Sequence, residues 1–143
     1  MIVALSAFMF AAAFVGAAIF VNVAEQPARL ALADGPLLVE WQRSYDRAAP
    51  MQGALALLSA LLGFVTAWQL HDWRWALGAL LILANWPYTL LAIKPTNDRL
   101  HAIAPDAADA HTRAMIVQWG HLHSGRSAFG VAATLVFLCA LAA

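Results

Sequence analysis

Four long apolar stretches constrain the fold of this chain more than any other feature of its sequence. They cover residues 1–23, 48–70, 73–93 and 115–143. Each approaches or exceeds the ~20 residues that a helix needs to cross a bilayer core of ~30 Å. We expect helices because backbone polar groups in lipid must be satisfied within the segment, and the alternation of β-barrel strands is absent. The sequence therefore predicts an all-α, integral membrane four-helix bundle, with one transmembrane domain over residues 1–143.

The composition favours lipid as the surrounding medium. Hydrophobic residues make up 63% of the 143 residues and charged residues only 11%, against about 25% charged residues in a typical soluble domain. A soluble chain of this size needs more polar residues to cover its surface. The formal net charge of zero argues against nucleic acid as a partner. The partners we expect are the lipid bilayer and a small apolar or aromatic ligand, and a homo-oligomer stays open.

Basic residues predict the orientation in the membrane. The long connections 24–47 and 94–113 fall on one side of the bilayer, because a tight turn at residues 71–72 joins the second and third spans. Only Arg74 lies on the other side. The remaining basic residues lie at or near the two long connections: Arg29, Arg43, Arg47, Lys94, Arg99, Arg113 and Arg126. The positive-inside tendency then predicts that both connections are cytoplasmic and that the protein lies in the inner, cytoplasmic membrane.

Ionisable groups at membrane depth are costly, so each needs a partner or a role. Asn22, Glu25 and Arg29 follow the first span with offsets of three and four, which places them on one face if the helix continues. Pro27 can kink or restart that helix. One interpretation is an interfacial helix end with an exposed Glu–Arg pair. The other is a carboxylate that turns into the bundle.

A second polar group lies in and after the third span. Asn85 and Thr89 share a helix face, and Pro87 frees a backbone carbonyl between them. Hydrogen bonding between helices is one explanation for Asn85. Asn97 follows Pro95 and could cap the next helix. A ligand site is the alternative for both residues.

The third group lies at the start of the fourth span. Trp119, His123 and Arg126 have the spacing i, i+4, i+7 and form one stripe of a helix, whereas His121 points elsewhere. An imidazole can act as a base, a hydrogen-bond partner or a metal ligand. A guanidinium can bind a carboxylate, an enolate or a phosphate, and Glu25 is a candidate partner for Arg126. The stripe is either a structural network or a substrate or cofactor site.

No metal site is predicted. His121 and His123 diverge on a helix, the only cysteine is Cys139, and neither HExxH nor CxxC occurs. A haem with His123 as its axial ligand stays open, but the spacing does not predict one. The cofactor content is therefore unknown, and none is favoured.

Three segments of the chain resemble the anthrone oxygenase-like family of small membrane proteins, many of which are domains of unknown function. They are residues 22–29, residues 86–100 with the Pro-Thr-Asn element, and residues 119–126 with Trp-x3-His-x2-Arg. The resemblance covers nearly the whole chain and includes the four-span layout. It places these residues at the family's motif positions: Glu25, Asn97, Trp119, His123 and Arg126.

The resemblance implies oxidation of an aromatic, polyketide-type or other apolar substrate, because fungal and bacterial relatives are associated with converting anthrones to anthraquinones. His123 or Glu25 would remove a proton, and Arg126 and Asn97 would stabilise the oxyanion, without a cofactor. The catalytic residues expected are thus His123, Glu25 and Arg126. The substrate-binding residues expected, with Trp119 and Tyr88 stacking on rings, are Asn22, Asn85, Tyr88, Asn97 and Trp119. The alternative is a non-enzymatic membrane module that binds lipid, quinone, haem or a protein partner.

Overall fold

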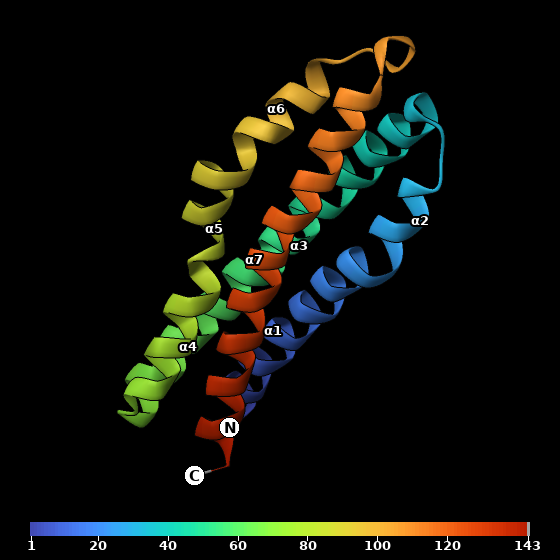
Figure 1. Cartoon of the computed structure of the whole chain (residues 1–143). Coiled ribbons are helices and arrows are strands. Elements are labelled where there is room, and N and C mark those ends of the chain that lie inside the picture. Colours follow the sequence, from blue (N-terminus) through green and yellow to red (C-terminus); the bar gives the residue numbers. More distant parts are fainter. Residues whose placement is uncertain (143) are drawn as a thin grey trace.

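A computed structural model describes residues 1–142, which form four long helical rods packed side by side as a bundle (Figure 1). Two rods are single helices, α3 and α7, and the other two are interrupted. The elements, in chain order, are α1 (Ile2–Phe20), η1 (Val21–Glu25), α2 (Gln26–Leu30), α3 (Asp34–Leu70), α4 (Trp73–Leu83), α5 (Asn85–Tyr88), η2 (Thr89–Ile93), α6 (Lys94–Ala102), η3 (Pro105–Ala107) and α7 (Ala110–Leu141). The all-α bundle predicted from the sequence is confirmed.

The helices extend well beyond the predicted spans. Most of the connections 24–47 and 94–113 is helical, because α3 already begins at Asp34 and α6 continues to Ala102. The last residue of the predicted fourth span, Ala143, lies outside the described residues. Both termini lie at the end of the bundle where α3 meets α4, and the other two connections lie at the opposite end (Figure 1). The tight turn predicted at residues 71–72 is confirmed.

Each of the four rods in the described part of the chain is long and apolar enough to cross a membrane. α1 and α4 each pack against both α3 and α7. Large apolar side chains such as Trp68 and Leu91 remain exposed on the outside of the bundle. Lipid is the medium that accommodates such a surface, so the chain is an integral membrane protein.

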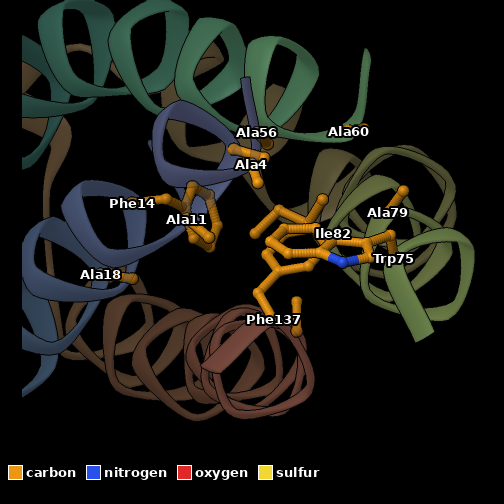
Figure 2. Close-up of a cluster of buried hydrophobic side chains, with 12 residues drawn as sticks. Ala4, Ala11, Phe14, Ala18, Ala56, Ala60, Trp75, Ala79, Ile82 and Phe137 are labelled. Carbon is orange, nitrogen blue, oxygen red and sulfur yellow. The ribbon is translucent and has the colours of Figure 1, made fainter. Parts of the chain in front are cut away.

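The half of the bundle near the termini has an apolar core of small residues packed around a few large rings. The stacked rings of Trp75 and Phe137 lie 5.1 Å apart (Figure 2). Gly78 allows this arrangement, because a Cβ there would lie 2.4 Å from the Phe137 ring. The remaining buried members, drawn with these rings in Figure 2, are Ala4, Ala7, Ala11, Phe14, Ala18, Ala56, Ala60, Ala79, Ile82 and Ala133. Small residues let membrane helices approach closely. The resulting van der Waals packing stabilises the bundle, because lipid provides no hydrophobic driving force for association of the helices.

Local signals define the helix ends. α3 ends at Leu70, and the residue that follows, His71, has a left-handed backbone with a φ of 55°. Asp72 caps the start of α4, because its side chain accepts a hydrogen bond from the backbone N–H of Arg74 at 3.0 Å. The hydrogen bond from the Arg74 side chain holds the pKa of Asp72 below its usual range. α7 begins with a capping box, in which Asp109 and Thr112 bond to each other's backbone N–H groups.

Two rods contain a π-helical turn at a similar position along the axis of the bundle. η1 separates α1 from α2, and η2 separates α5 from α6. The third rod is also interrupted at Ala84, three residues before Pro87, and the Asn85 side chain there donates to the Ile82 carbonyl at 3.1 Å. Such π-turns often mark functional sites. They position a polar layer between the apolar core and a second cluster formed by Val21, Leu37, Leu38, Trp41, Ile93, Leu100, Met115, Ile116 and Trp119.

Candidate functional site

His123 of α7 is hydrogen-bonded to Asn22 of η1. Its side chain is buried, and its Nδ1 lies 3.1 Å from Asn22 Oδ1. The same oxygen accepts a hydrogen bond from Ser127 at 2.8 Å. The Asn22 amide nitrogen donates to the Gly120 carbonyl at 3.0 Å and to Ser124 at 3.1 Å. One asparagine therefore links η1 to two turns of α7.

These contacts determine which nitrogen of His123 carries the proton. A carbonyl oxygen only accepts, so the bond to Gly120 requires that Asn22 present its NH2 group to α7 and its Oδ1 to His123. Nδ1 must then be the donor of the imidazole. In the neutral ring this leaves the lone pair on Nε2, which is the nitrogen free to act as a base.

Glu25 pairs with Arg29 rather than with Arg126. Arg29 lies 2.6 Å from Glu25 and 2.7 Å from Glu40 of α3, and its side chain is only 2% exposed. Ser44 donates a hydrogen bond to Glu25. The expected Glu25–Arg126 pair is therefore wrong. The Glu–Arg pair at this helix end does form, but its arginine is buried instead of exposed, because α3 continues past the membrane span and covers it.

Asn97 belongs to an aromatic cluster next to this ion pair. Its amide nitrogen donates to the Tyr45 hydroxyl at 2.7 Å, and its oxygen accepts from the Trp119 indole at 2.9 Å. Trp41 stacks on Tyr45 with ring centres 5.2 Å apart, and the Trp119 ring lies 5.0 Å from the imidazole of His123. Asn97 does not cap a helix, because η2 leads directly into α6. The Asn97 amide therefore links Tyr45 of α3 to Trp119 of α7, whose ring lies beside His123.

Arg126 has no ionic partner among the described residues. Its side chain is 6% exposed, it forms no ion pair within residues 1–142, and its Nε has no hydrogen-bond acceptor. The nearest described interaction is with the face of Phe14, 5.5 Å from the ring centre. A cation–π contact compensates only part of the cost of burying a guanidinium. Arg126 is therefore available to an anion from outside the chain.

Two cavities meet at Arg126. The smaller, of about 20 Å³, has room for about one water molecule. Its polar lining residues are Glu25, Arg29, Ser44, Tyr45, Gln52, Trp119, His123 and Arg126. The larger, of about 170 Å³, is lined by Tyr45, Ala49, Gly53, Ala56, Asn85, Trp86, Thr89, Leu90 and Arg126. The two are neighbours, since Tyr45, Ala49 and Arg126 line both.

The described residues form no group of three or more His, Cys, Asp or Glu side chains that could hold a metal ion. The space beside His123 is about 20 Å³, which is far too small for a porphyrin. The residues as arranged here therefore do not fit a haem on His123.

The predicted site residues fall into three sets. Trp119, His123 and Arg126 come together around the small cavity, as their i, i+4, i+7 spacing indicated, and Glu25 from the first rod lines the same cavity. Asn85 lines the larger cavity together with Thr89, and Asn22 supports His123 from outside both. Neither Asn97 nor Tyr88 lines a cavity at Arg126.

Tyr88 lies against α7. It donates to the Leu122 carbonyl at 2.8 Å. Its ring packs closely over Gly125, where a Cβ would lie 2.3 Å from the hydroxyl oxygen. This contact holds the third rod against α7.

Sequence reasoning missed most of the contribution of α3. Trp41 of α3 is fully buried, and Tyr45 of the same helix lines both cavities. Ser44 and Gln52 also line the small cavity. The available signal was weak: Gln52 is an isolated polar residue in an apolar span, and Ser44, Tyr45 and Gln52 have the spacing of one helix face.

The comparisons with known proteins bear on this arrangement. The family model for anthrone oxygenase matches residues 41–136, more than half of the chain. The chain belongs to the anthrone oxygenase family. The matched range contains Asn97, Trp119, His123 and Arg126, whereas Asn22 and Glu25 precede it. Neither a curated protein nor a solved structure matches the chain.

Proposed function

We propose that this member of the anthrone oxygenase family is a membrane oxygenase that oxidises an anthrone-like aromatic substrate with dioxygen and without a cofactor. The observation that carries the proposal is the pair formed by His123 and Arg126 on one face of α7. The first offers a free Nε2 and the second an unpaired positive charge, both at the same small cavity. A proton acceptor beside a cation is the arrangement that enolate formation requires.

His123 is the base. The substrate is acidic at the ring carbon opposite its carbonyl, and Nε2 takes that proton directly or through one water molecule in the small cavity. Asn22 keeps the proton of the imidazole on Nδ1 and so keeps Nε2 ready. Glu25 is the weaker candidate, because Arg29 and Ser44 already occupy its carboxylate.

Arg126 stabilises the negative charge that develops on the carbonyl oxygen when the proton leaves. The electron-rich carbon then reacts with dioxygen and forms a carbon–oxygen bond as a hydroperoxide. Cleavage of the O–O bond with loss of the remaining hydrogen on that carbon gives a ketone and one water. In total, the substrate and one dioxygen become the quinone and one water, so atoms and electrons balance without a further reductant.

We also propose the orientation expected from the basic residues. The connections at the α2–α3 and α6–α7 end would face the cytoplasm, in an inner or cytoplasmic membrane. This places the His123 layer nearer the cytoplasmic face than the apolar core of alanines and Phe137.

The test is oxidation of 1,8-dihydroxyanthrone by the protein in nanodiscs, followed by the absorbance of the anthraquinone and corrected for empty nanodiscs. His123→Gln preserves the size and polarity of the side chain but removes the base. We expect it to lower the rate by roughly 100-fold or more. Arg126→Lys should lower it too, because a point charge replaces the planar guanidinium.

His121→Gln is the matched control, because His121 lies two residues away on the exposed side of α7. It should keep the wild-type rate. A folded His123→Gln protein that oxidises the anthrone as fast as the wild type would disprove the assignment. If the wild type binds aromatic molecules but oxidises none above the blank, the non-enzymatic binding module is the better description.

A further inference from the structure

The larger cavity lies between α3 and the α5–η2 segment and is lined mostly by apolar groups. Ala49, Gly53 and Ala56 share one face of α3, and Trp86 and Leu90 form the facing wall. A Cβ built on Gly53 would already be in van der Waals contact with the Trp86 ring at 3.7 Å, so a larger side chain there would extend into the cavity or displace the indole. The volume of about 170 Å³ is close to that of apolar cavities that bind a single benzene ring.

The cavity has its opening on the lipid side. Trp86 and Leu90 are 44% and 54% exposed, and both lie in the apolar part of the third rod. Gly53 lies in the apolar part of α3. A molecule dissolved in the bilayer can therefore reach the cavity without crossing water.

The inner end of the cavity carries an uncompensated positive charge. Arg126 lines it and has neither an ion pair nor an acceptor for Nε among residues 1–142. Asn85 Oδ1, from the facing rod, is likewise buried without a donor. Buried polar atoms are almost always paired, so both atoms indicate a ligand with an anionic group and a hydrogen-bond donor near it.

We propose that this cavity is a lipid-facing binding site for an aromatic anion, with one ring in the space that Ala49, Gly53, Trp86 and Leu90 line and the negative group at Arg126. The inference rests on the proposed function in that the bound anion would be the enolate that deprotonation of the anthrone forms. A ring is favoured over an acyl chain, because the volume of about 170 Å³ suits a single ring and the lining includes the indole of Trp86, on which a ring can stack. Additional rings of a larger molecule would extend through the lipid-facing opening.

The test measures binding of anthraquinone-2-carboxylate to the protein in nanodiscs, by quenching of tryptophan fluorescence against empty nanodiscs. Arg126→Gln and Gly53→Leu should each weaken binding by about tenfold or more, the first through charge and the second through space. Gly16→Leu is the matched control. Gly16 is exposed on α1 with open space around it, so this variant should bind as the wild type does. Circular dichroism and thermal unfolding identify any variant that fails to fold.

Two further ligands test the chemistry. Neutral anthraquinone should bind at least about tenfold more weakly than the carboxylate, and dodecanoate should not compete with it at equal concentration. Equal binding of the neutral ring, or competition by dodecanoate, would overturn the assignment of an aromatic anion. So would unchanged binding in folded Arg126→Gln and Gly53→Leu.

The two proposals can fail separately. A wild type that binds the carboxylate at this site but oxidises no anthrone supports the binding site and refutes the proposed reaction. A wild type that oxidises the anthrone while folded Gly53→Leu binds and reacts normally refutes the binding site alone.

Discussion

At the scale of the residue, the chemistry of His123 depends on a neighbour that touches no cavity at Arg126. Asn22 accepts from His123 and Ser127 and donates to Gly120 and Ser124. Each of these bonds limits the others, so the asparagine cannot rotate without losing several of them. It is a positioning residue, because it acts through the imidazole rather than on a substrate.

Asn22→Leu should therefore lower kcat and leave KM nearly unchanged. Leucine has a similar volume but cannot accept the Nδ1 proton, so both tautomers become populated and the base is lost part of the time. We expect a decrease of roughly tenfold or more, in the range of general acid–base effects. Steady-state oxidation of 1,8-dihydroxyanthrone measures both constants.

Asn22→Asp is the conservative variant for this prediction. Its carboxylate still accepts from His123, so it should retain more activity than Asn22→Leu. If both variants lose stability and activity to the same degree, Asn22 has only a structural role. A thermal unfolding curve for each variant decides between these outcomes.

At the scale of the element, glycines determine how closely the helices approach. Gly78 and Gly63 both lie against the ring of Phe137. The ring fills the space that both glycines leave, which joins α3, α4 and α7 in one contact. Sequence alone does not separate these glycines from Gly16, which has nothing within 4 Å of an added Cβ.

Gly78→Ala should destabilise the bundle, because the new methyl group would overlap the Phe137 ring. Overpacking of this kind costs about 1–3 kcal/mol. Gly16→Ala is the control and should leave the Tm unchanged or raise it, since alanine is the better helix former. Thermal unfolding in detergent compares the two. Phe137→Leu should restore part of the stability of Gly78→Ala, and a Gly78→Ala protein as stable as Gly16→Ala would contradict the packing.

The start of α7 should respond to acid. Hydrogen bonds from the Thr112 backbone N–H and hydroxyl hold the pKa of Asp109 below its usual range. Because the folded-state pKa is lowered, this stabilisation is present above about pH 4 and is lost as the pH falls through the lowered pKa. Asp109→Ala should remove that part of the acid sensitivity.

Hydrogen exchange at the first turn of α7, measured from pH 7 down to pH 3, checks this expectation. The protection factor, which corrects the exchange rate for its intrinsic pH dependence, should fall at the acidic end in the wild type and should be low throughout in Asp109→Ala. Asp106→Ala is the matched control, since Asp106 lies in η3 outside the capping box. An identical pH profile in wild type and Asp109→Ala would count against the role of the cap.

At the scale of the whole molecule, the bundle has a distinct polarity along its axis. The end near the termini is an apolar core with the Asp72–Arg74 ion pair at its tight turn. The opposite end carries the other ion pairs, among them the one between Arg113 and Asp34. Arg113 also donates to the Leu30 carbonyl at 2.8 Å, which fixes the α2–α3 connection to α7.

This polarity predicts the topology. With the basic end in the cytoplasm, a reporter fused after the last residue should lie on the outer side of the membrane. An alkaline phosphatase fusion should therefore be active and a green fluorescent protein fusion dark. The reverse pattern would show that the lysine and arginine count does not set the orientation of this chain.

The fold class and one face of the candidate site follow from the amino-acid sequence alone. Four apolar stretches longer than a bilayer is thick leave helices as the only way to satisfy the backbone, and the i, i+4, i+7 spacing of Trp119, His123 and Arg126 places them on one face of any helix. Neither inference needs knowledge of what the helices contact.

The ion-pair and hydrogen-bond partners on neighbouring helices can be seen only in the folded bundle. Glu25 could reach either arginine from its position in the sequence, and the continuation of α3 past the membrane span, with Glu40 and Ser44, draws Arg29 to it. Arg126 is thereby left without a carboxylate beside an open cavity. Spacing along one helix gives no information about which side chains a neighbouring helix presents, so only the folded bundle shows that the carboxylates of Glu25 and Glu40 pair with Arg29 and not with Arg126.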